Sequence, residues 1–93
     1  MNKRKFRLDI VIAAHKRSIR HRNEILQSDI CGCFNCLNIF NPSDIEHWID
    51  KNENGIGQTA MCPKCSVDTV LGSKSGYTIN SDFLTAMKRY WCS

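Results

Sequence analysis

The sequence predicts a small α+β domain, and three features lead to this fold class. The 93 residues leave room for a single domain, 1–93, with a thin core. Amphipathic helices are expected near both ends of the chain, and short apolar segments of β character lie between them. Two Cys-x-x-Cys pairs, Cys33/Cys36 and Cys62/Cys65, lie in that middle part. We therefore expect a long N-terminal helix, a C-terminal helix and a centre held by cysteines.

The N-terminal helix is expected over residues 8–27. Neither proline nor glycine occurs in residues 1–31, and one face is formed at offsets of three and four by Leu8, Val11, Ile12, His15, Ile19, Arg22 and Leu26. His15 and Arg22 interrupt this apolar face. An arginine there usually packs its stem and directs its head to a carbonyl or carboxylate, and the histidine is expected to be a core residue with a local partner. Alternatively, the two residues form a site in a groove.

The remaining elements are expected to be short. A strand is predicted over 37–40, and the Asn41-Pro42 pair marks the start of a helix that ends near Asp50. The apolar face of that helix would be formed by Ile45, Trp48 and Ile49, which makes Trp48 a core residue. A strand over 58–61 and helical turns over 67–71 follow. Asn80 or Ser81 caps the last helix, 81–91, whose apolar face contains Phe83, Leu84, Met87 and Trp91.

Four cysteines have the spacing of a metal site. Cys33 and Cys36 are separated by two residues, as are Cys62 and Cys65, and 25 residues lie between the pairs. This spacing turns both thiolates of a pair toward one ion, and two pairs complete a tetrahedron with Zn–S bonds of ~2.3 Å. Four thiolates leave no open position, so we expect one structural Zn²⁺. A redox pair would need only one unit, and ferredoxin spacings are absent.

The expected arrangement is like a treble clef, in which the first cysteine knuckle lies on a hairpin and the second at the start of a helix. Cys62 and Cys65 would lie on the first turn of a helix ending at Leu71, and Pro63 would start it. The remaining cysteines, Cys31 and Cys92, are expected to be free or buried thiols.

The charge is unevenly distributed along the chain. The net charge is +4, yet residues 1–22 contain eight basic groups and only one acid, Asp9. Such a segment favours contact with phosphate or with an acidic protein surface. Alternatively, as is more usual for a run of charges, residues 3–7 form a solvated terminus and the other cations a polar helix face. Residues 1–7 are expected to form a basic, disordered arm. The candidate partner-binding residues are Lys16, Arg17, Arg20, Arg22 and His15.

Composition excludes several classes of protein. Hydrophobic residues make up 42% and charged residues 24%, which are globular values. No apolar run approaches the ~20 residues of a membrane span, and Ile10 to Ala14 is too short for a signal-peptide core. We therefore expect a cytoplasmic protein without a membrane partner.

No catalytic residues are expected. His-Asn-His nucleases also use a treble clef, and Glu46-His47 lies between the two knuckles. However, their general base lies on a hairpin strand, whereas His47 falls on a predicted helix, and no histidine follows Cys65. The residues do not assemble a nucleophile, an acid or an activating metal, so we expect a protein that is not an enzyme.

The chain resembles a family of small, mostly uncharacterised bacterial cytoplasmic proteins over about four-fifths of its length. The resemblance is carried by residues 15–22, Cys31-Gly-Cys-Phe-Asn-Cys36, Ile45, Trp48-Ile-Asp50, Gln58-Thr-Ala-Met-Cys-Pro-Lys-Cys65, Asp68-Thr-Val-Leu-Gly72, Ser75-Gly76 and the 83–91 segment. It implies a zinc-binding, treble-clef-like domain with two knuckles and no established activity. Small proteins of this kind occur near mobile elements, which suggests a phage- or defence-related binding role.

Two functions remain open at this point. The first is a protein-interaction module, such as an inhibitor or regulator, that docks an acidic partner with the basic helix or pairs with itself as a homodimer. The second is a nucleic-acid-binding zinc protein that uses the basic N-terminal segment. Both use the same cations, so the sequence does not separate them.

Overall fold

The computed structural model describes residues 7–92, so most of the expected basic arm lies outside the described residues. Its helices and strands, in chain order, are α1 (Leu8–His15), η1 (Lys16–Ser18), α2 (Arg22–Gln27), β1 (Cys31–Cys33), β2 (Ile39–Phe40), η2 (Pro42–Asp44), β3 (Trp48–Lys51), β4 (Gly57–Ala60), β5 (Val70–Gly72), η3 (Ser73–Ser75) and α3 (Ser81–Trp91). The α+β class is thus confirmed. Within this part of the chain, no helix has the length and apolar character needed to cross a membrane.

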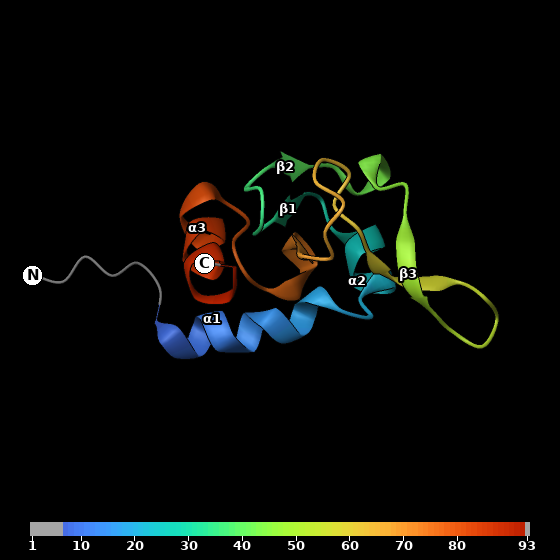
Figure 1. Cartoon of the computed structure of the whole chain (residues 1–93), viewed down its shortest axis with the longest axis horizontal. Helices are drawn as coiled ribbons and strands as arrows, with labels where there is room; N and C mark the ends of the chain where they lie inside the picture. The colour runs from blue at the N-terminus through green and yellow to red at the C-terminus, as the bar shows by residue number, and fades with distance from the viewer. Residues whose placement is uncertain (1–6, 93) are drawn as a thin grey trace, which may run out of the picture.

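The strands form two small antiparallel sheets. The first has the order β2-β1-β5, and the second is the β3–β4 hairpin. In Figure 1, α3 lies beside the first half of α1 at one end of the molecule, and the hairpin projects at the other. The indole Nε1 of Trp91 donates to the Val11 carbonyl oxygen at 3.0 Å and so joins the two helices.

Gly32 allows α3 to pack closely on the first sheet. A Cβ atom on this residue would lie 2.8 Å from a methyl carbon of Leu84 and 2.9 Å from one of Ile79, closer than side-chain carbons approach. Cys31 and Cys33, on either side of Gly32 in β1, face the other part of the core. The central strand therefore separates two groups of buried side chains.

These two groups make up the core. The group around the cysteines contains Ile25, Cys31, Cys33, Phe40, Ile45, Ala60, Cys62 and Val70. The group under α1 and α3 contains Val11, Ala14, Phe34, Leu71, Phe83, Leu84 and Met87. Consecutive residues of β5 belong to different groups, as the alternation of side chains along a strand requires.

The prediction of one continuous helix over 8–27 was wrong. The backbone leaves the helix after η1, with Ile19 extended and Arg20 at φ +49°, and α2 begins at Arg22. The Ser18 hydroxyl donates to the His15 carbonyl oxygen at 2.6 Å. A serine side chain that bonds to its own backbone competes with regular helix structure.

Contacts with the β3–β4 hairpin stabilise this break. The Arg20 N–H donates to Thr59 Oγ1 at 2.8 Å, and the Arg22 guanidinium donates to the Gly57 carbonyl oxygen at 2.9 Å. Between them, the His21 ring accepts from the Ala60 N–H at 3.2 Å. Three consecutive residues thus bind one strand, which a continuous helix would not allow.

The predicted helix from Pro42 to Asp50 was also wrong beyond its first turn. Pro42–Asp44 forms only a 3₁₀ turn, and Trp48 and Ile49 belong to β3, where they pair with β4. Ile45 is buried, Trp48 is half-buried against the group of residues around the cysteines, and Ile49 is 37% exposed. Strand pairing across the hairpin determined the structure of this segment.

The helical turns predicted over 67–71 are replaced by β5, which pairs with β1 along its whole length. The second knuckle therefore leads into a strand, and the helix that a treble clef requires at this point is not formed. The helix over 81–91 was predicted correctly, as was the strand over 58–61 to within one residue. The strand predicted over 37–40 is only Ile39–Phe40, because Leu37 belongs to the turn after Cys36. The Asn80 side chain caps that helix by accepting from the Phe83 N–H at 2.9 Å.

Candidate metal centre

The first knuckle is a tight turn between β1 and β2. The Cys33 N–H donates to the Asn38 carbonyl oxygen at 3.0 Å, and the Leu37 N–H donates to the Cys33 carbonyl oxygen at 2.8 Å. Leu37 has φ +68°, a conformation that a non-glycine residue rarely adopts. This left-handed residue reverses the chain directly after Cys36.

The second knuckle repeats this backbone pattern after β4. The Cys62 N–H donates to the Val67 carbonyl oxygen at 2.9 Å, and the Ser66 N–H donates to the Cys62 carbonyl oxygen at 2.9 Å. Ser66, directly after Cys65, has φ +63°. The two Cys-x-x-Cys units therefore have equivalent hydrogen bonds and equivalent turns.

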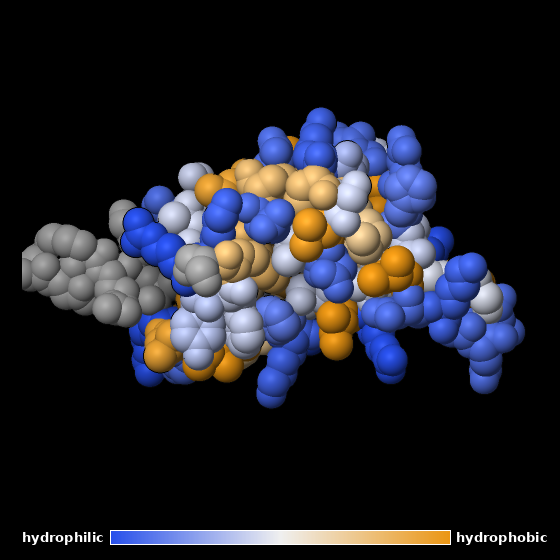
Figure 2. All heavy atoms as spheres, viewed as in Figure 1, coloured by the Kyte–Doolittle hydropathy of each residue, from blue (hydrophilic) through white to orange (hydrophobic). Residues whose placement is uncertain are grey.

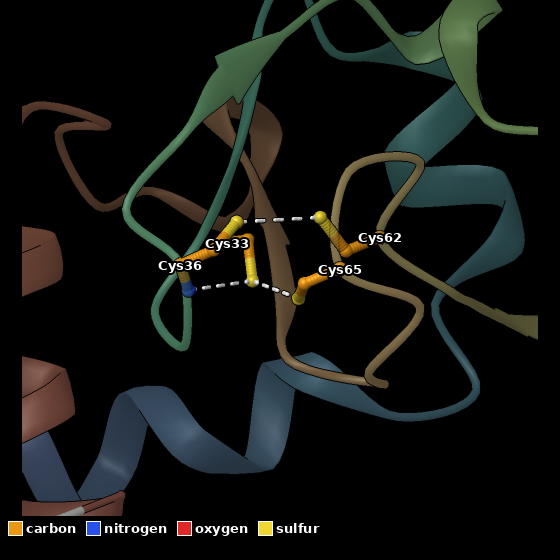
Figure 3. Close-up of side chains that lie close together, drawn as sticks. All are labelled: Cys33, Cys36, Cys62 and Cys65. Atoms are coloured by element: carbon orange, nitrogen blue, oxygen red, sulfur yellow. Dashed lines mark hydrogen bonds between the residues drawn. The ribbon is translucent and has the colours of Figure 1, made fainter.

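The two knuckles bring all four sulfur atoms together. Their Sγ atoms lie within 4.8 Å of one another, with Cys33 and Cys65 at 3.6 Å and Cys36 and Cys62 at 3.7 Å (Figure 3). Four Zn–S bonds of ~2.3 Å in a tetrahedron require S···S separations of about 3.8 Å. The cluster thus has the dimensions of a four-thiolate site that could hold one metal ion.

Backbone amides point at two of the sulfurs. The N–H groups of Asn35 and Cys36 lie 3.3 and 3.4 Å from Cys33 Sγ, and the Lys64 N–H lies 3.3 Å from Cys62 Sγ. These donors favour the thiolate over the thiol because each hydrogen bond stabilises negative charge on sulfur.

Three side chains outside the cysteine pairs extend this shell. Asn38 donates from Nδ2 to Cys36 Sγ at 3.3 Å, and Asn35 donates from Nδ2 to Cys65 Sγ at 3.5 Å. The Thr69 hydroxyl lies 3.0 Å from Cys33 Sγ. Outer partners of this kind orient metal ligands. Sequence reasoning missed all three, although the two asparagines lie within two residues of Cys36.

Without a metal, the thiols differ in acidity. Burial raises the pKa of Cys33 and of Cys62. Burial acts in the same direction on Cys36, but hydrogen bonds from Asn38, Cys62 and Cys33 outweigh it and lower its pKa to about 7. A metal ion must therefore displace protons from at least the two buried thiols when it binds.

The other two cysteines lie outside the cluster. Cys31 is fully buried, and burial raises its pKa to about 12, which makes it an unreactive core residue. Cys92 is half-buried next to the end of α3, and burial raises its pKa as well.

Two of the candidate partner-binding residues make internal contacts. Arg22 donates to the Gly57 carbonyl oxygen, and its Cζ lies 4.6 Å from the centre of the Trp48 ring. His15 stacks on Trp91 with ring centres 3.8 Å apart. These positions agree with the interpretation of both as packed residues with local partners.

The other three candidates, Lys16, Arg17 and Arg20, are exposed around the helix break. They line a hollow of ≈ 330 Å³ together with Gln58 of β4. Arg17 forms an ion pair with Glu24. The structure thus gathers these cations at one concave place rather than along a continuous helix face.

Comparisons with family models, with curated proteins and with solved structures found no match for the chain. Membership of a bacterial cytoplasmic family therefore stays a prediction. The placement of His47 on a helix, used in the nuclease comparison, was wrong: this residue is exposed directly before β3, and its carbonyl oxygen accepts from the Met61 N–H at 2.9 Å.

Proposed function

We propose that the chain is a non-enzymatic binding module whose fold is held by one structural zinc ion. The cluster of four sulfurs, all within 4.8 Å of one another and with two pairs near the tetrahedral separation, carries this proposal. Four thiolates fill the coordination sphere, so water would have no open position on the ion. The ion would also join two knuckles whose surrounding core is small, and its binding free energy would then become folding free energy.

The experiment that tests the zinc centre measures metal and folding in the same samples. Native mass spectrometry and elemental analysis of the full chain should give one zinc per chain. C36S and C62S should lose zinc and the cooperative unfolding transition, whereas C92S, the matched control, should keep both. A C62S protein that is folded and free of metal would refute the structural role of the ion.

For the partner, we propose a cytoplasmic protein with an acidic surface, which the module would regulate or inhibit. The exposed cations Lys16, Arg17 and Arg20 supply the charge for such docking. The ends of α1 and α3 add exposed apolar side chains, namely Leu8, Ile12, Tyr90 and Trp91. The same residues could support a homodimer, and sedimentation of the zinc-loaded chain at several concentrations tests that state.

Nucleic acid is the second candidate partner, and one observation favours it. Three cations surround a hollow rather than spreading over a flat surface. Concave cationic sites suit phosphate groups, which carry a permanent charge and several acceptor oxygens.

A further inference from the structure

We propose that the hollow at the helix break binds a phosphate group of a nucleic-acid backbone. The inference rests on the second candidate function and on the zinc-held fold, and it names the residues and the ligand chemistry. The hollow has a volume of ≈ 330 Å³ and is formed by side chains of the 16–24 segment and by Gln58 of β4. In Figure 2, hydrophilic side chains project between hydrophobic ones along the edge of the molecule where α1 and η1 lie.

The charge of this hollow is not balanced internally. Glu24 forms an ion pair with Arg17 and so compensates one of the three cations. Within residues 7–92, Lys16 and Arg20 form no ion pair in the structure, although both line the hollow. Two positive charges thus remain available to an anion.

The backbone of Arg20 is fixed in an unusual conformation. Its φ of +49° is costly for a residue with a side chain, and such conformations persist only where the surroundings hold them. Here the Arg20 N–H donates to Thr59 Oγ1, and the fully buried Thr59 hydroxyl donates to Asp50 Oδ2 at 2.7 Å. This chain of hydrogen bonds fixes the backbone that carries the Arg20 side chain at the hollow.

The lining favours a phosphate over a base or a protein carboxylate. The only ring in it belongs to His21, which is 5% exposed and hydrogen-bonded at both nitrogens, so no aromatic surface is available for base stacking. Lysine and arginine contacts to phosphate need no particular sequence. A concave site also suits a group that presents several oxygens at one point, whereas an acidic protein surface distributes its carboxylates over a wider area.

The test is a titration of a mixed-sequence, fluorescently labelled oligonucleotide, as single strand and as duplex, with the zinc-loaded full chain. Anisotropy at several salt concentrations gives the slope of log K against log salt. K16Q and R20Q should each reduce the magnitude of this slope, by at most about 0.7–0.9, the value for the one phosphate contact proposed. R20K should keep the wild-type slope. K74Q is the matched control, because Lys74 is exposed and does not line the hollow.

Zinc content and far-UV circular dichroism of every variant separate the two proposals. A chain that holds zinc and folds but does not bind the oligonucleotide at low salt overturns this inference and leaves the zinc-held module intact. Equal weakening by K74Q and R20Q would also overturn it, since binding would then follow net charge alone. A third contrary result is binding that is lost when Lys3, Arg4 and Lys5 become glutamine but is unchanged in R20Q. An affinity that appears only for acidic proteins would assign the hollow to the protein partner instead.

Discussion

The His21 ring connects the helix break to the β3–β4 hairpin through both of its nitrogens. Nδ1 lies 2.7 Å from the Arg17 carbonyl oxygen, and Nε2 lies 3.2 Å from the Ala60 amide nitrogen. A carbonyl oxygen only accepts and an amide N–H only donates. The ring therefore carries its hydrogen on Nδ1, and Nε2 is unprotonated and accepts the hydrogen bond. The neutral imidazole is therefore the form that fits the fold.

Acid should destabilise the fold through this ring. Burial lowers the pKa of His21, although the hydrogen bond to Arg17 and the charge of Glu24 oppose the effect. Below about pH 6.5 the unfolded chain binds a proton that the folded chain resists, so stability falls with pH until the folded pKa is reached. The loss is at most about 1.4 kcal/mol per pH unit.

Urea unfolding of the zinc-loaded chain between about pH 7.5 and pH 5.5 measures this loss. H21Q, which keeps an amide donor and acceptor but does not titrate, should lose less stability over that range than the wild type. A metal ion bound at the four cysteines would add the same pH dependence to both proteins, and comparing the two proteins removes it. Identical pH dependence in the two proteins would contradict the lowered pKa of His21.

Zinc affinity should fall as the pH falls. Burial raises the pKa of Cys33 and of Cys62 in the metal-free centre, so both hold protons at neutral pH and must release them to bind the ion. Competition with a chelator at several pH values should show more than one proton released per zinc. Calorimetry in buffers of different ionisation enthalpy provides an independent count, and a pH-independent affinity would contradict the prediction.

Replacement of Arg22 should weaken the attachment of α2 to the hairpin. Its guanidinium donates to the Gly57 carbonyl oxygen and covers the Trp48 ring, so R22A removes a hydrogen bond and a cation–π contact. We expect a loss of about 1–3 kcal/mol in the free energy of unfolding. R22K should retain only part of the stability that R22A loses, because an ammonium group lacks the planar face and the several donors of a guanidinium.

Denaturant unfolding followed by tryptophan fluorescence measures the effect, with K74A as a surface control that should change little. W48A should cost less than the roughly 3–5 kcal/mol typical of a fully buried aromatic, because Trp48 is only half-buried. An R22A protein as stable as the wild type would show that the contact contributes nothing.

Gly32 should not tolerate a side chain. An added Cβ would lie 2.8 Å from a methyl carbon of Leu84, which is fully buried, so in G32A the Leu84 side chain or the elements on either side of it must shift. Overpacking of this kind costs about 1–3 kcal/mol. In a double-mutant cycle, L84A should relieve part of the cost of G32A, and additive effects of the two substitutions would place the strain elsewhere.

Sequence reasoning was most accurate for features that depend on neighbouring residues or on the chemistry of particular side chains. The spacing of the four cysteines led directly to the cluster, and the Asn80 cap together with the apolar face of 81–91 led to α3. The helix cap, the apolar face and each cysteine pair depend on residues within a few positions of one another, and the metal chemistry of thiolates indicates that the two pairs meet. Once the two pairs had been assigned to a metal site, Cys31 was left over and was predicted to be a free or buried thiol.

The sequence misled where long-range pairing decided the structure. Residues 8–27 have a helical pattern, but the bonds of Arg20, His21 and Arg22 to β4 interrupt it. Leu71 belongs to β5 rather than to a helix because the strand pairs with β1, more than thirty positions earlier in the chain. A local pattern shows neither of these two pairings, even where it shows the strand itself, as at 58–61. The treble-clef interpretation could therefore not be corrected from the sequence.

The equivalence of the knuckles has a consequence for how the chain folds. Each knuckle is closed by hydrogen bonds among neighbouring residues, so both turns can form early and at little entropic cost. A metal ion held by the four cysteines would close the long loop between Cys36 and Cys62, and the β1–β5 pairing closes a similar loop around the same centre. Closing either loop shortens the chain segment that remains to be closed in the other, so metal binding and formation of the β1–β5 pairing should occur together in one cooperative step. A chelator should therefore unfold the sheet rather than only remove the ion.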